Sequence, residues 1–528
     1  MDHIISMSAF LLTCLLVFAS ALIVHGATGS LCSQTPYPEL CTSFMVSHKP
    51  DQETTSSIVH RDSALSATMA QAVQAHRLVS DMDTSSFEER AKSAWADCLE
   101  HYEDSIHQIN RSMSTDKRDK SNNNVQTWLS SALTNHQTCQ DGFTDFNLST
   151  TYSNSFPLNN FTKFLGNSLA INKALMSSQT FGLSSGNSKG RHLLAQDMPE
   201  WISVSDRKLL QATAPKPDLV VAQDGSGHYR TISEAVAAAR TGTKRFVIYV
   251  KKGVYKENVE IKKSVKNLML VGDGMDATVV TASKSNADGS TTFRSATFAA
   301  SGDGLIVRGM TFENTAGPQS HQAVALRSGS DLSVFYSCSF KGYQDTLYVY
   351  SQRQFYRNCD IYGTVDFIFG NAAAIMQNCN IYVRKPMSNQ FNTVTAQGRT
   401  DPNQNTGIVL HNCRITAASD LKTVQGSFKT YLGRPWKQYS RTVVLKSFLD
   451  GLIHSTGWLP WSGDFALKTL YYGEFMNSGS GAGTGGRVRW PGYHVITGVQ
   501  EAERFSVRSF IGGDSWLAAT GVPYTSGL

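Results

Sequence analysis

Two aspartates occupy the same position in consecutive copies of a short internal repeat. Asp345 ends one copy and Asp366 ends the next, and each follows a cysteine by seven residues and a glycine by three. Two further copies, around Cys379 and Cys413, lack the acid. A period of about 20 residues, built on short apolar strands, is typical of a stacked β-solenoid, whose successive coils lie about 4.8 Å apart. The repeat therefore predicts that the two carboxylates lie side by side.

Two adjacent carboxylates support acid–base chemistry, because like charges at short range rarely both ionise and the pair divides into an acid and a base. Neutral amide donors accompany the pair in this sequence. Gln344 directly precedes Asp345, and Gln322 lies one coil earlier in the same stack. Such donors suit the oxyanion that develops in acyl transfer. The residue types therefore point to acyl chemistry at the aspartate pair.

An arginine and a tryptophan supply the rest of a candidate site. Arg434 can keep a neighbouring carboxylate ionised through a bidentate bond, and Trp436 offers a flat face to a sugar ring. The competing interpretation is structural: stacked Asp, Asn and Gln side chains in solenoids often satisfy the backbone of turns, and most aromatic residues pack in the core. Polar residues that converge from adjoining coils exceed what turns require, which favours catalysis.

The elements that must hold these residues are short strands. From residue 219 onward, β-rich runs such as Phe246–Val250 alternate with Gly, Asp and Asn. A short helix is expected at Ile232–Ala239, where it would close the otherwise exposed N-terminal edge of the solenoid. A stretch rich in Gly and Trp, from Trp458 to Trp490, leaves the repeat pattern and is expected to pack over the outside. The predicted fold class of this part is mainly β.

The N-terminal part of the chain differs in its periodicity. Apolar residues recur at three- and four-residue spacing, which predicts helices at residues 64–79, 87–109, 125–134 and 161–174. Four of the nine cysteines lie in this part. Cys32 and Cys41 are close enough for a local disulfide, which leaves Cys98 to pair with Cys139, although four cysteines allow three connectivities.

The beginning of the chain predicts export. Residues 10–24 are almost wholly apolar and precede small residues, as in a secretory signal cleaved near Gly26–Ala27. An uncleaved signal anchor is the alternative interpretation. An exported chain can form disulfides and carry N-linked sugars. The tripeptide Asn-x-Ser/Thr occurs at Asn110, Asn147 and Asn160, which predicts glycosylation of this region.

Charge is divided unevenly along the chain. The net charge of the whole chain is +6, whereas the part from residue 211 onward carries 33 Lys and Arg against 22 Asp and Glu, or +11. A basic domain suggests an anionic partner, and for an exported protein an acidic polysaccharide is more plausible than nucleic acid. The alternative is that excess lysine merely solubilises the surface. Residues 176–214 form a basic linker in which Arg191–Leu194 and Arg207–Leu210 are candidate cleavage sites.

The motifs around the aspartate pair resemble those of a known family. Five segments carry the resemblance: Gly253–Glu257, Gln322–Arg327, Tyr343–Tyr348, Asp366–Gly370 and Leu432–Trp436. They are similar, in type and order, to the signature segments of plant pectin methylesterases, and the similarity spans about residues 215–528. The helical part is similar to the inhibitor-like pro-region of the same proteins, through Trp95–Cys98 and Cys139–Phe143.

The resemblance implies a precursor with four parts. These are a signal peptide at 1–26, an inhibitor-like four-helix bundle at 27–175, a linker with processing motifs at 176–210 and a right-handed parallel β-helix at 211–528. It also implies a subtilisin-like protease that cuts at basic Leu-Leu motifs, of which Arg207-Lys208-Leu209-Leu210 is the closer match. A Cys359–Cys379 disulfide is implied as well, and the repeat register agrees with it without excluding a bond between Cys338 and Cys359.

Residue roles follow from the same resemblance. Asp366 would be the nucleophile, Asp345 the general acid and then the general base, and Gln344 a stabiliser of the transition state. Substrate contacts would come from Thr292, Gln322, Arg434 and Trp436. The resemblance implies no cofactor and no metal ion.

The function that follows is hydrolysis of methyl esters of cell-wall homogalacturonan, the acidic polysaccharide of pectin, with release of methanol through an aspartyl acyl-enzyme. The expected protein is thus a carboxylic ester hydrolase secreted to the cell wall, with pectin, the processing protease and a proteinaceous inhibitor as partners. The pro-region would inhibit the enzyme or assist folding and export. One rival is a polygalacturonase or pectate lyase on the same solenoid. Another is a non-catalytic, pectin-binding solenoid joined to a helical inhibitor module.

Overall fold

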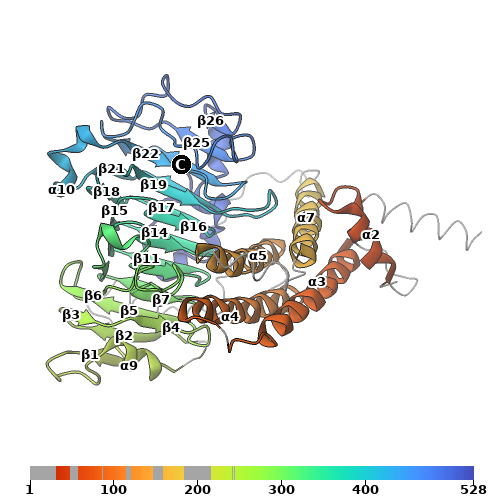
Figure 1. The fold of residues 1–528 in the computed structure, drawn as a ribbon, viewed down its shortest axis with the longest axis horizontal. Coiled ribbons are helices and arrows are strands. Elements are labelled where there is room, and N and C mark those ends of the chain that lie inside the picture. The colour runs from red at the N-terminus through yellow and green to blue at the C-terminus, as the bar shows by residue number, and fades with distance from the viewer. Residues whose placement is uncertain are drawn as a thin grey trace, which may run out of the picture. The chain divides into compact units, whose positions relative to one another are not determined.

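The computed structural model describes residues 31–47, 57–85, 87–114, 121–146, 159–182, 216–240, 242 and 244–528. The chain forms two compact units, one of residues 1–85 and 98–190 and the other of residues 86–97 and 191–528. The first unit is helical and the second is built on β-strands (Figure 1). The predicted signal peptide and both predicted cleavage motifs lie outside the described residues.

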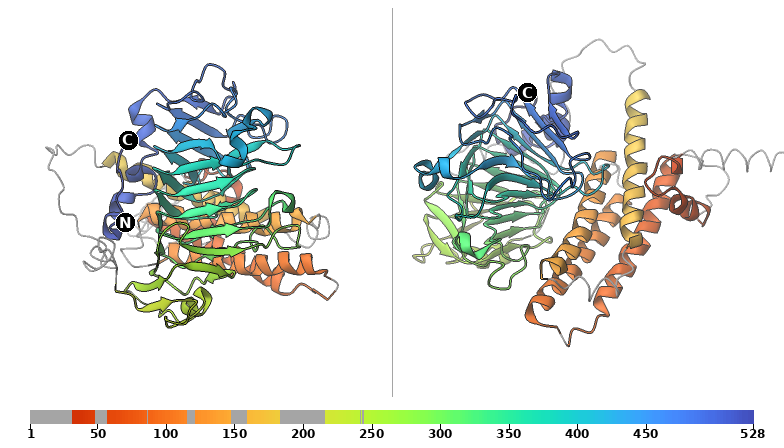
Figure 2. Two further views of the ribbon diagram at one scale, coloured as in Figure 1. Left: turned by 90° about the vertical axis from the view of Figure 1, so that its left-hand side faces the viewer. Right: turned by 45° about the horizontal axis from the view of Figure 1, so that its top comes forward.

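The β unit is a solenoid of three parallel sheets, and each full coil contributes one strand to each sheet (Figure 2, left). The eleven-stranded sheet contains β1 (Leu219–Val221), β2 (Phe246–Val250), β5 (Leu268–Gly272), β8 (Ile306–Arg308), β11 (Ser333–Tyr336), β14 (Arg353–Arg357), β17 (Ala373–Gln377), β20 (Gly407–His411), β23 (Arg441–Leu445), β25 (Tyr471–Phe475) and β26 (Tyr493–Val495). The eight-stranded sheet contains β3 (Gly253–Lys256), β6 (Thr278–Ala282), β9 (Thr311–Asn314), β12 (Ser339–Lys341), β15 (Asp360–Gly363), β18 (Asn380–Val383), β21 (Arg414–Ala417) and β24 (Phe448–Leu449). The seven-stranded sheet contains β4 (Val259–Ile261), β7 (Phe298–Ala300), β10 (Leu326–Ser328), β13 (Leu347–Val349), β16 (Ile368–Gly370), β19 (Asn392–Gln397) and β22 (Thr430–Gly433).

The core consists of columns of like side chains, because parallel strands in register place equivalent residues above one another. One column of the eight-stranded sheet runs through Phe312, Phe340, Ile361, Ile381 and Ile415. All five side chains are fully buried. Each such burial is worth about 1.5–3 kcal/mol relative to an exposed side chain, so the stacked columns provide most of the solenoid's stability. This confirms the predicted parallel β-helix.

The four cysteines of the solenoid form another column. Cys338, Cys359, Cys379 and Cys413 each precede residues paired in successive strands, and all four are buried free thiols. The predicted Cys359–Cys379 disulfide is therefore wrong for this structure. Each thiol instead bonds to a backbone carbonyl oxygen of the preceding coil. The Cys359 Sγ donates to the carbonyl oxygen of Phe335 at 3.3 Å, and the Cys379 Sγ donates to that of Tyr356 at 3.6 Å.

The residue before each of these cysteines turns the chain between two sheets. Ser337, Asn358, Asn378 and Asn412 adopt φ values of 51°, 52°, 57° and 52°. This is the left-handed region, which asparagine tolerates better than most residues. The recurrent Asn-Cys pair of the repeat is therefore a corner followed by a core position.

Elements outside the repeat close the solenoid. The predicted N-terminal helix is present as α9 (Ile232–Ala237), which begins with a capping box between Thr231 and Glu234 and buries Ile232 in the core. The outer face of the eleven-stranded sheet is covered by the chain end, which includes α11 (Val499–Glu503) and α12 (Val507–Phe510). The expectation that the stretch from Trp458 packs outside is wrong for Trp458 itself. Its ring is buried in the core at 4.2 Å from that of Tyr472.

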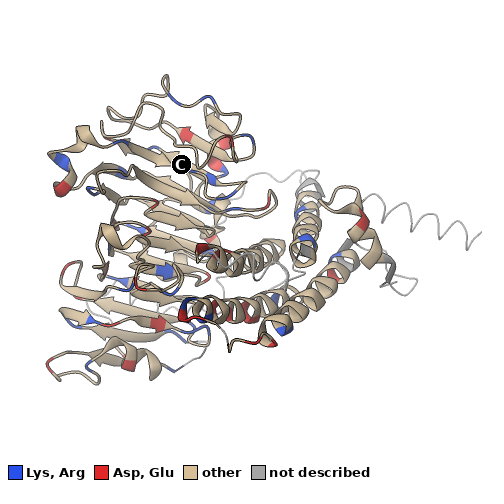
Figure 3. Cartoon of the chain, in the orientation of Figure 1, with Lys and Arg blue, Asp and Glu red and all other residues tan. Residues whose placement is uncertain are grey.

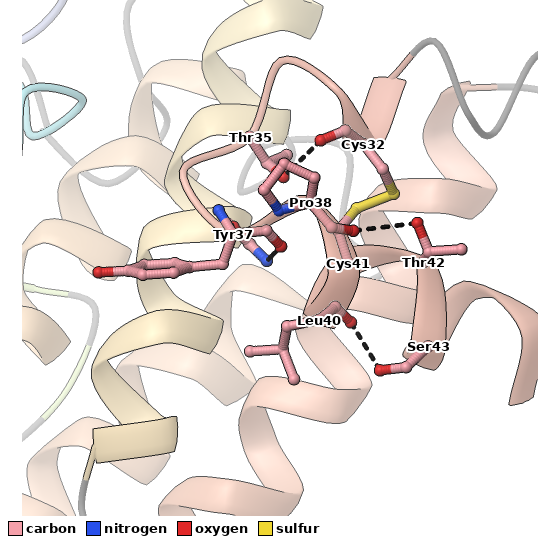
Figure 4. Close-up of a disulfide and its surroundings, with 9 residues drawn as sticks. Cys32, Thr35, Tyr37, Pro38, Leu40, Cys41, Thr42 and Ser43 are labelled. Atoms are coloured by element: carbon pink, nitrogen blue, oxygen red, sulfur yellow. Dashed lines mark hydrogen bonds between the residues drawn. A yellow bond between two sulfur atoms is a disulfide. The ribbon is translucent and has the colours of Figure 1, made fainter.

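The helical part contains α2 (Pro38–Ser47) and four helices of 24 residues each, α3 (Ser57–Ser80), α4 (Glu89–Ser112), α5 (Asn122–Asp145) and α7 (Asn159–Gly182). Helix α7 packs against both α3 and α5. The predicted disulfides Cys32–Cys41 and Cys98–Cys139 are both present, with Cα atoms 5.5 Å and 4.6 Å apart. Figure 4 shows the Cys32–Cys41 disulfide. The loop between these cysteines is held by Asn167, whose side chain accepts from the Tyr37 N–H and donates to the Tyr37 carbonyl oxygen.

The surface of the helical part bears on the predicted sugar sites. Asn110 and Asn160 are exposed, whereas Asn147 lies outside the described residues. Among the helices of the described residues, none has the length and apolarity to cross a membrane.

Candidate active site

The two aspartates lie at equivalent corners of adjacent coils. Asp345 stands between β12 and β13, and Asp366 stands between β15 and β16. Strands β12 and β15 pair in register, as do β13 and β16, so the two corners are stacked. Both residues adopt left-handed φ values, 62° for Asp345 and 52° for Asp366, and both are buried. The structure thus brings together the two carboxylates that the repeat singled out.

The Asp366 carboxylate is held by charged and neutral donors. The Arg434 Nε donates to Asp366 Oδ1 at 2.8 Å and the Arg434 Nη2 donates to Oδ2 at 2.6 Å. A third bond comes from the Thr393 hydroxyl, which donates to Oδ1 at 2.6 Å. Charge-assisted bidentate pairs of this kind fix the orientation of a carboxylate.

Arg434 is itself firmly placed. Its backbone N–H donates to the Thr395 carbonyl oxygen at 3.0 Å, and its guanidinium lies 4.3 Å from the ring centre of Trp461. Burial opposes the charge of this side chain, but the Asp366 carboxylate outweighs burial and raises the pKa of Arg434, with a smaller contribution from Asp345. Arg434 therefore keeps its charge beside the aspartate pair.

The two predicted amides flank the pair from neighbouring coils. Gln344 precedes Asp345, and its carbonyl oxygen accepts from the N–H of Ala323, the residue after Gln322. Both glutamines are half-buried. Within the described part of the chain, neither side-chain amide is engaged in a hydrogen bond, so both can donate to a bound molecule.

A cluster of aromatic residues lies beside these polar groups on the seven-stranded sheet, and among its rings only that of Trp436 is partly exposed. The rings of Tyr348 and Phe369 stack at 4.2 Å, and Trp436 meets Phe369 edge to face at 5.9 Å. Gly398 lies beneath Trp436, where a methyl group would come within 2.8 Å of the indole Cε3. Aromatic faces of this kind suit sugar rings, which present apolar C–H faces.

Thr292 and Phe367 occupy different surroundings. Thr292 is half-buried and directly precedes Phe293, whose ring joins the aromatic cluster through Tyr350 at 5.2 Å. Phe367 lies in the corner before β16, points inward and is fully buried in the core. Phe369, within β16, belongs instead to the aromatic cluster beside the site.

Thr393 is the site residue that the sequence did not reveal. The spacing of seven residues after each cysteine, extended to Cys379, leads to Pro386. Eight residues separate β18 from β19, whereas four separate β15 from β16, so the longer loop shifts the equivalent position to the start of β19. The repeat rule fails at this coil because the corner carries an insertion.

Comparisons with known proteins agree with these features. A family model described as pectinesterase matches residues 218–514, and one described as plant invertase/pectin methylesterase inhibitor matches residues 27–171. The chain belongs to the pectinesterase family. Pectinesterase 2 of Citrus sinensis is 52% identical to it over 94% of both chains. A probable pectinesterase/pectinesterase inhibitor of Arabidopsis thaliana is also 52% identical, over 94% of this chain and 93% of that protein.

Solved structures of pectin methylesterases match the solenoid of this pectinesterase. The carrot enzyme is 60% identical, with a TM-score of 0.59, and the match covers 60% of this chain and 100% of that one. An enzyme of Aspergillus niger is 32% identical, with a TM-score of 0.51, over 58% of this chain and 97% of the other.

Proposed function

We propose that the solenoid hydrolyses the methyl esters of homogalacturonan, releasing methanol and leaving free galacturonate carboxylates. The main observation behind this proposal is that Arg434 donates two hydrogen bonds to the Asp366 carboxylate, in the coil next to that of Asp345. Membership in the pectinesterase family supports the substrate class. The partly exposed ring of Trp436 suits contact with a sugar ring of this polysaccharide.

The division of roles follows from Arg434. Two adjacent carboxylates favour one shared proton over two negative charges. Arg434 contacts Asp366, so the negative charge stays on Asp366 and the proton on Asp345. Asp366 is then the nucleophile and Asp345 the proton donor.

The first half of the reaction forms an acyl-enzyme. An oxygen of Asp366 attacks the ester carbonyl carbon, and the electron pair of the C=O bond moves to the carbonyl oxygen. The amides of Gln322 and Gln344 donate to this oxyanion. When the intermediate collapses, the bond to the methoxy oxygen breaks and Asp345 gives its proton to the departing methanol.

The second half restores the enzyme. Asp345, now a carboxylate, takes a proton from a water molecule, whose oxygen attacks the acyl carbon. The bond to Asp366 breaks and galacturonate leaves, while Asp345 holds the proton for the next cycle. Thr292, Gln322, Arg434 and Trp436 are proposed to contact the substrate, and no step requires a cofactor.

Isosteric substitutions test the assignment. We expect Asp366→Asn and Asp345→Asn each to lower methanol release at least ~10³-fold, because each removes a group that bonds to or protonates the reacting atoms. Asp360→Asn, in the same coil as Asp366, is the control and should retain activity. Normal methanol release by either active-site variant would contradict the proposal. New reducing ends or unsaturated products would instead indicate a glycosidase or a lyase.

The helical part is proposed to restrain the enzyme until it is removed. The match of residues 27–171 to the inhibitor family supports this role. We further propose secretion to the cell wall, cleavage by a subtilisin-like protease after Leu210 and glycosylation at Asn110, Asn147 and Asn160. Methanol release should rise when purified full-length protein is cut at that site, and N-terminal sequencing of wall-extracted protein would locate the cut. Equal activity before and after cleavage would instead favour a role in folding or export.

A further inference from the structure

We infer that Thr393 is a positioning residue for Asp366, and that it makes Oδ2 of this carboxylate the attacking oxygen. The inference rests on the proposed role of Asp366 as the nucleophile. Thr393 lies at the start of β19, one coil beyond Asp366, and its side chain is fully buried.

The hydroxyl of Thr393 binds Asp366 twice. It accepts from the Asp366 backbone N–H at 2.8 Å and donates to Asp366 Oδ1 at 2.6 Å. A hydroxyl group has a single proton, whose direction depends on what its lone pairs accept. Because the backbone N–H of Asp366 occupies the accepting side, the proton is directed at the carboxylate of the same residue.

The backbone of Thr393 adds rigidity. Its N–H donates to the Thr364 carbonyl oxygen at 3.1 Å, and its own carbonyl oxygen accepts from the Phe367 N–H at 3.3 Å. The corner that carries Asp366 is therefore bonded to Thr393 on both sides of the aspartate. The hydroxyl sits on this frame and fixes the rotation of the carboxylate.

The two carboxylate oxygens consequently differ. Oδ1 accepts from the Thr393 hydroxyl and from the Arg434 Nε, which together occupy both of its lone pairs. Oδ2 accepts from the Arg434 Nη2 alone among the described residues. The remaining lone pair of Oδ2 is therefore the one that can form the new bond to the ester carbon. Loss of the Thr393 hydroxyl would let the carboxylate rotate and would leave the backbone N–H of Asp366 without this hydrogen-bond acceptor.

Thr278 offers a matched comparison away from the site. It begins β6 and is fully buried, and its hydroxyl accepts from the Asp273 N–H at 3.0 Å and donates to the Val250 carbonyl oxygen at 3.2 Å. If Thr393 served only strand packing, its replacement by valine would affect kcat no more than the same replacement at the comparison position, because β-branched side chains favour strands wherever they occur.

The test compares Thr393→Val, Thr393→Ser and Thr278→Val in the full-length protein after cleavage at the linker. We expect Thr393→Val to lower kcat by ~10–100-fold with KM changed less than about twofold, because a misplaced reacting group costs up to about 100-fold in rate. Thr393→Ser, which keeps the hydroxyl, should recover most of kcat. Thr278→Val should lose thermal stability to a similar degree and keep kcat within about twofold.

Three results would overturn the inference: an unchanged kcat in Thr393→Val, an equal loss of kcat in Thr278→Val, or failure of Thr393→Ser to recover activity. If the valine variant does not fold, Thr393→Ala and Thr393→Ser replace it, since these two differ by one oxygen atom, and equal kcat values would overturn the inference. Failure of the proposed function is recognised separately, because Asp366→Asn would then still release methanol.

Discussion

Arg434 and Asp366 form the pair on which the proposed chemistry depends. The guanidinium supplies two of the three side-chain donors to the carboxylate, at 2.8 Å and 2.6 Å. Both groups are largely removed from solvent, so neither charge is well hydrated without the other. Removing one partner of a buried pair therefore costs more than the pair itself contributes.

Substitution of Arg434 should affect activity and stability together. We expect Arg434→Gln to lower kcat by ~10²–10³-fold and to reduce the free energy of unfolding by about 3 kcal/mol, because Asp366 becomes a buried charge without a counter-ion. Arg434→Lys should recover little, since an ammonium group cannot form the planar two-bond contact. Kinetics and denaturant unfolding measure both effects.

The control for this prediction is Arg508→Gln, which removes an exposed pair with Asp514 near the end of the chain. Such surface pairs contribute at most about 1 kcal/mol. Full activity in Arg434→Gln would show that the pair does not hold the nucleophile.

Gly398 permits Trp436 to lie flat at the site. An added methyl group would approach the Trp436 Cε3 to 2.8 Å, so Gly398→Ala must displace the indole ring. We expect KM for pectin to rise ~3–10-fold with kcat less affected, because the ring is proposed to contact substrate and not the reacting atoms. Gly426→Ala is the control, since a methyl group there meets nothing within 4 Å. An unchanged KM in Gly398→Ala would remove Trp436 from the substrate contacts.

Among the elements of the solenoid, the corners between strands position the two aspartates, and the strands keep these corners in place. The left-handed corner residues Asp345 and Asp366 repeat the geometry of Asn358 and Asn378 at another edge of the coil. Aspartate and asparagine tolerate this conformation for the same reason, since their short polar side chains bond locally. The two aspartates therefore occupy corner positions that the solenoid already provides.

Helix α5 carries a buried histidine that should make the helical part sensitive to acid. Burial lowers the pKa of His136 to about 4, and its Nδ1 lies 2.9 Å from the Tyr102 hydroxyl. The unfolded chain, with a pKa near 6.5, binds more protons between these values. Stability is thus complete above about pH 6.5 and is lost as the pH falls toward 4, by about 3 kcal/mol in total.

Hydrogen exchange in α5, measured from pH 7 to pH 4 and corrected for intrinsic rates, checks this prediction. His136→Gln keeps a polar side chain that does not titrate, so protection of α5 should depend less on pH in this variant. An identical pH dependence in both proteins would show that another group controls the acid sensitivity.

At the scale of the whole molecule, charge gathers at the beginning of the solenoid. Residues 240–266 contain nine Lys and Arg against two Asp and Glu, a net +7 out of the +11 carried from residue 211 onward. Figure 3 shows how charged residues are distributed over the ribbon. Lys244, Lys262 and Lys266 in this segment are exposed, and none forms an ion pair within the described residues. A polyanion such as demethylated pectin meets the least electrostatic opposition here.

Replacing Lys244, Lys262 and Lys266 by Gln should weaken binding to polygalacturonate ~10-fold at low salt and reduce its salt dependence, because exposed charges act within a Debye length of about 10 Å at 0.1 M salt. Replacing the exposed Lys385, Lys422 and Lys429 removes the same charge elsewhere and is the control. Equal weakening in both triple variants would mean that only net charge matters. Binding can be followed by retention on immobilised polygalacturonate.

The sequence by itself determined the parallel solenoid, the helical N-terminal part and the pairing of Asp345 with Asp366. These features follow from the spacing of apolar and polar residues. In the solenoid this spacing is visible as a sequence repeat, because each coil contains the same strands and corners. The two disulfides of the helical part were predictable because each cysteine had few partners there.

Only the tertiary structure decided the matters that depend on direction and on loop length. Cys359 and Cys379 are equivalent in register yet unbonded, and each thiol donates to a backbone carbonyl oxygen instead. Thr393 reaches Asp366 across a corner that an insertion has lengthened, so no fixed spacing points to it. The repeat period in the sequence shows which residues occupy equivalent positions in successive coils. The atoms that each side chain contacts depend on its direction, which only the three-dimensional structure shows.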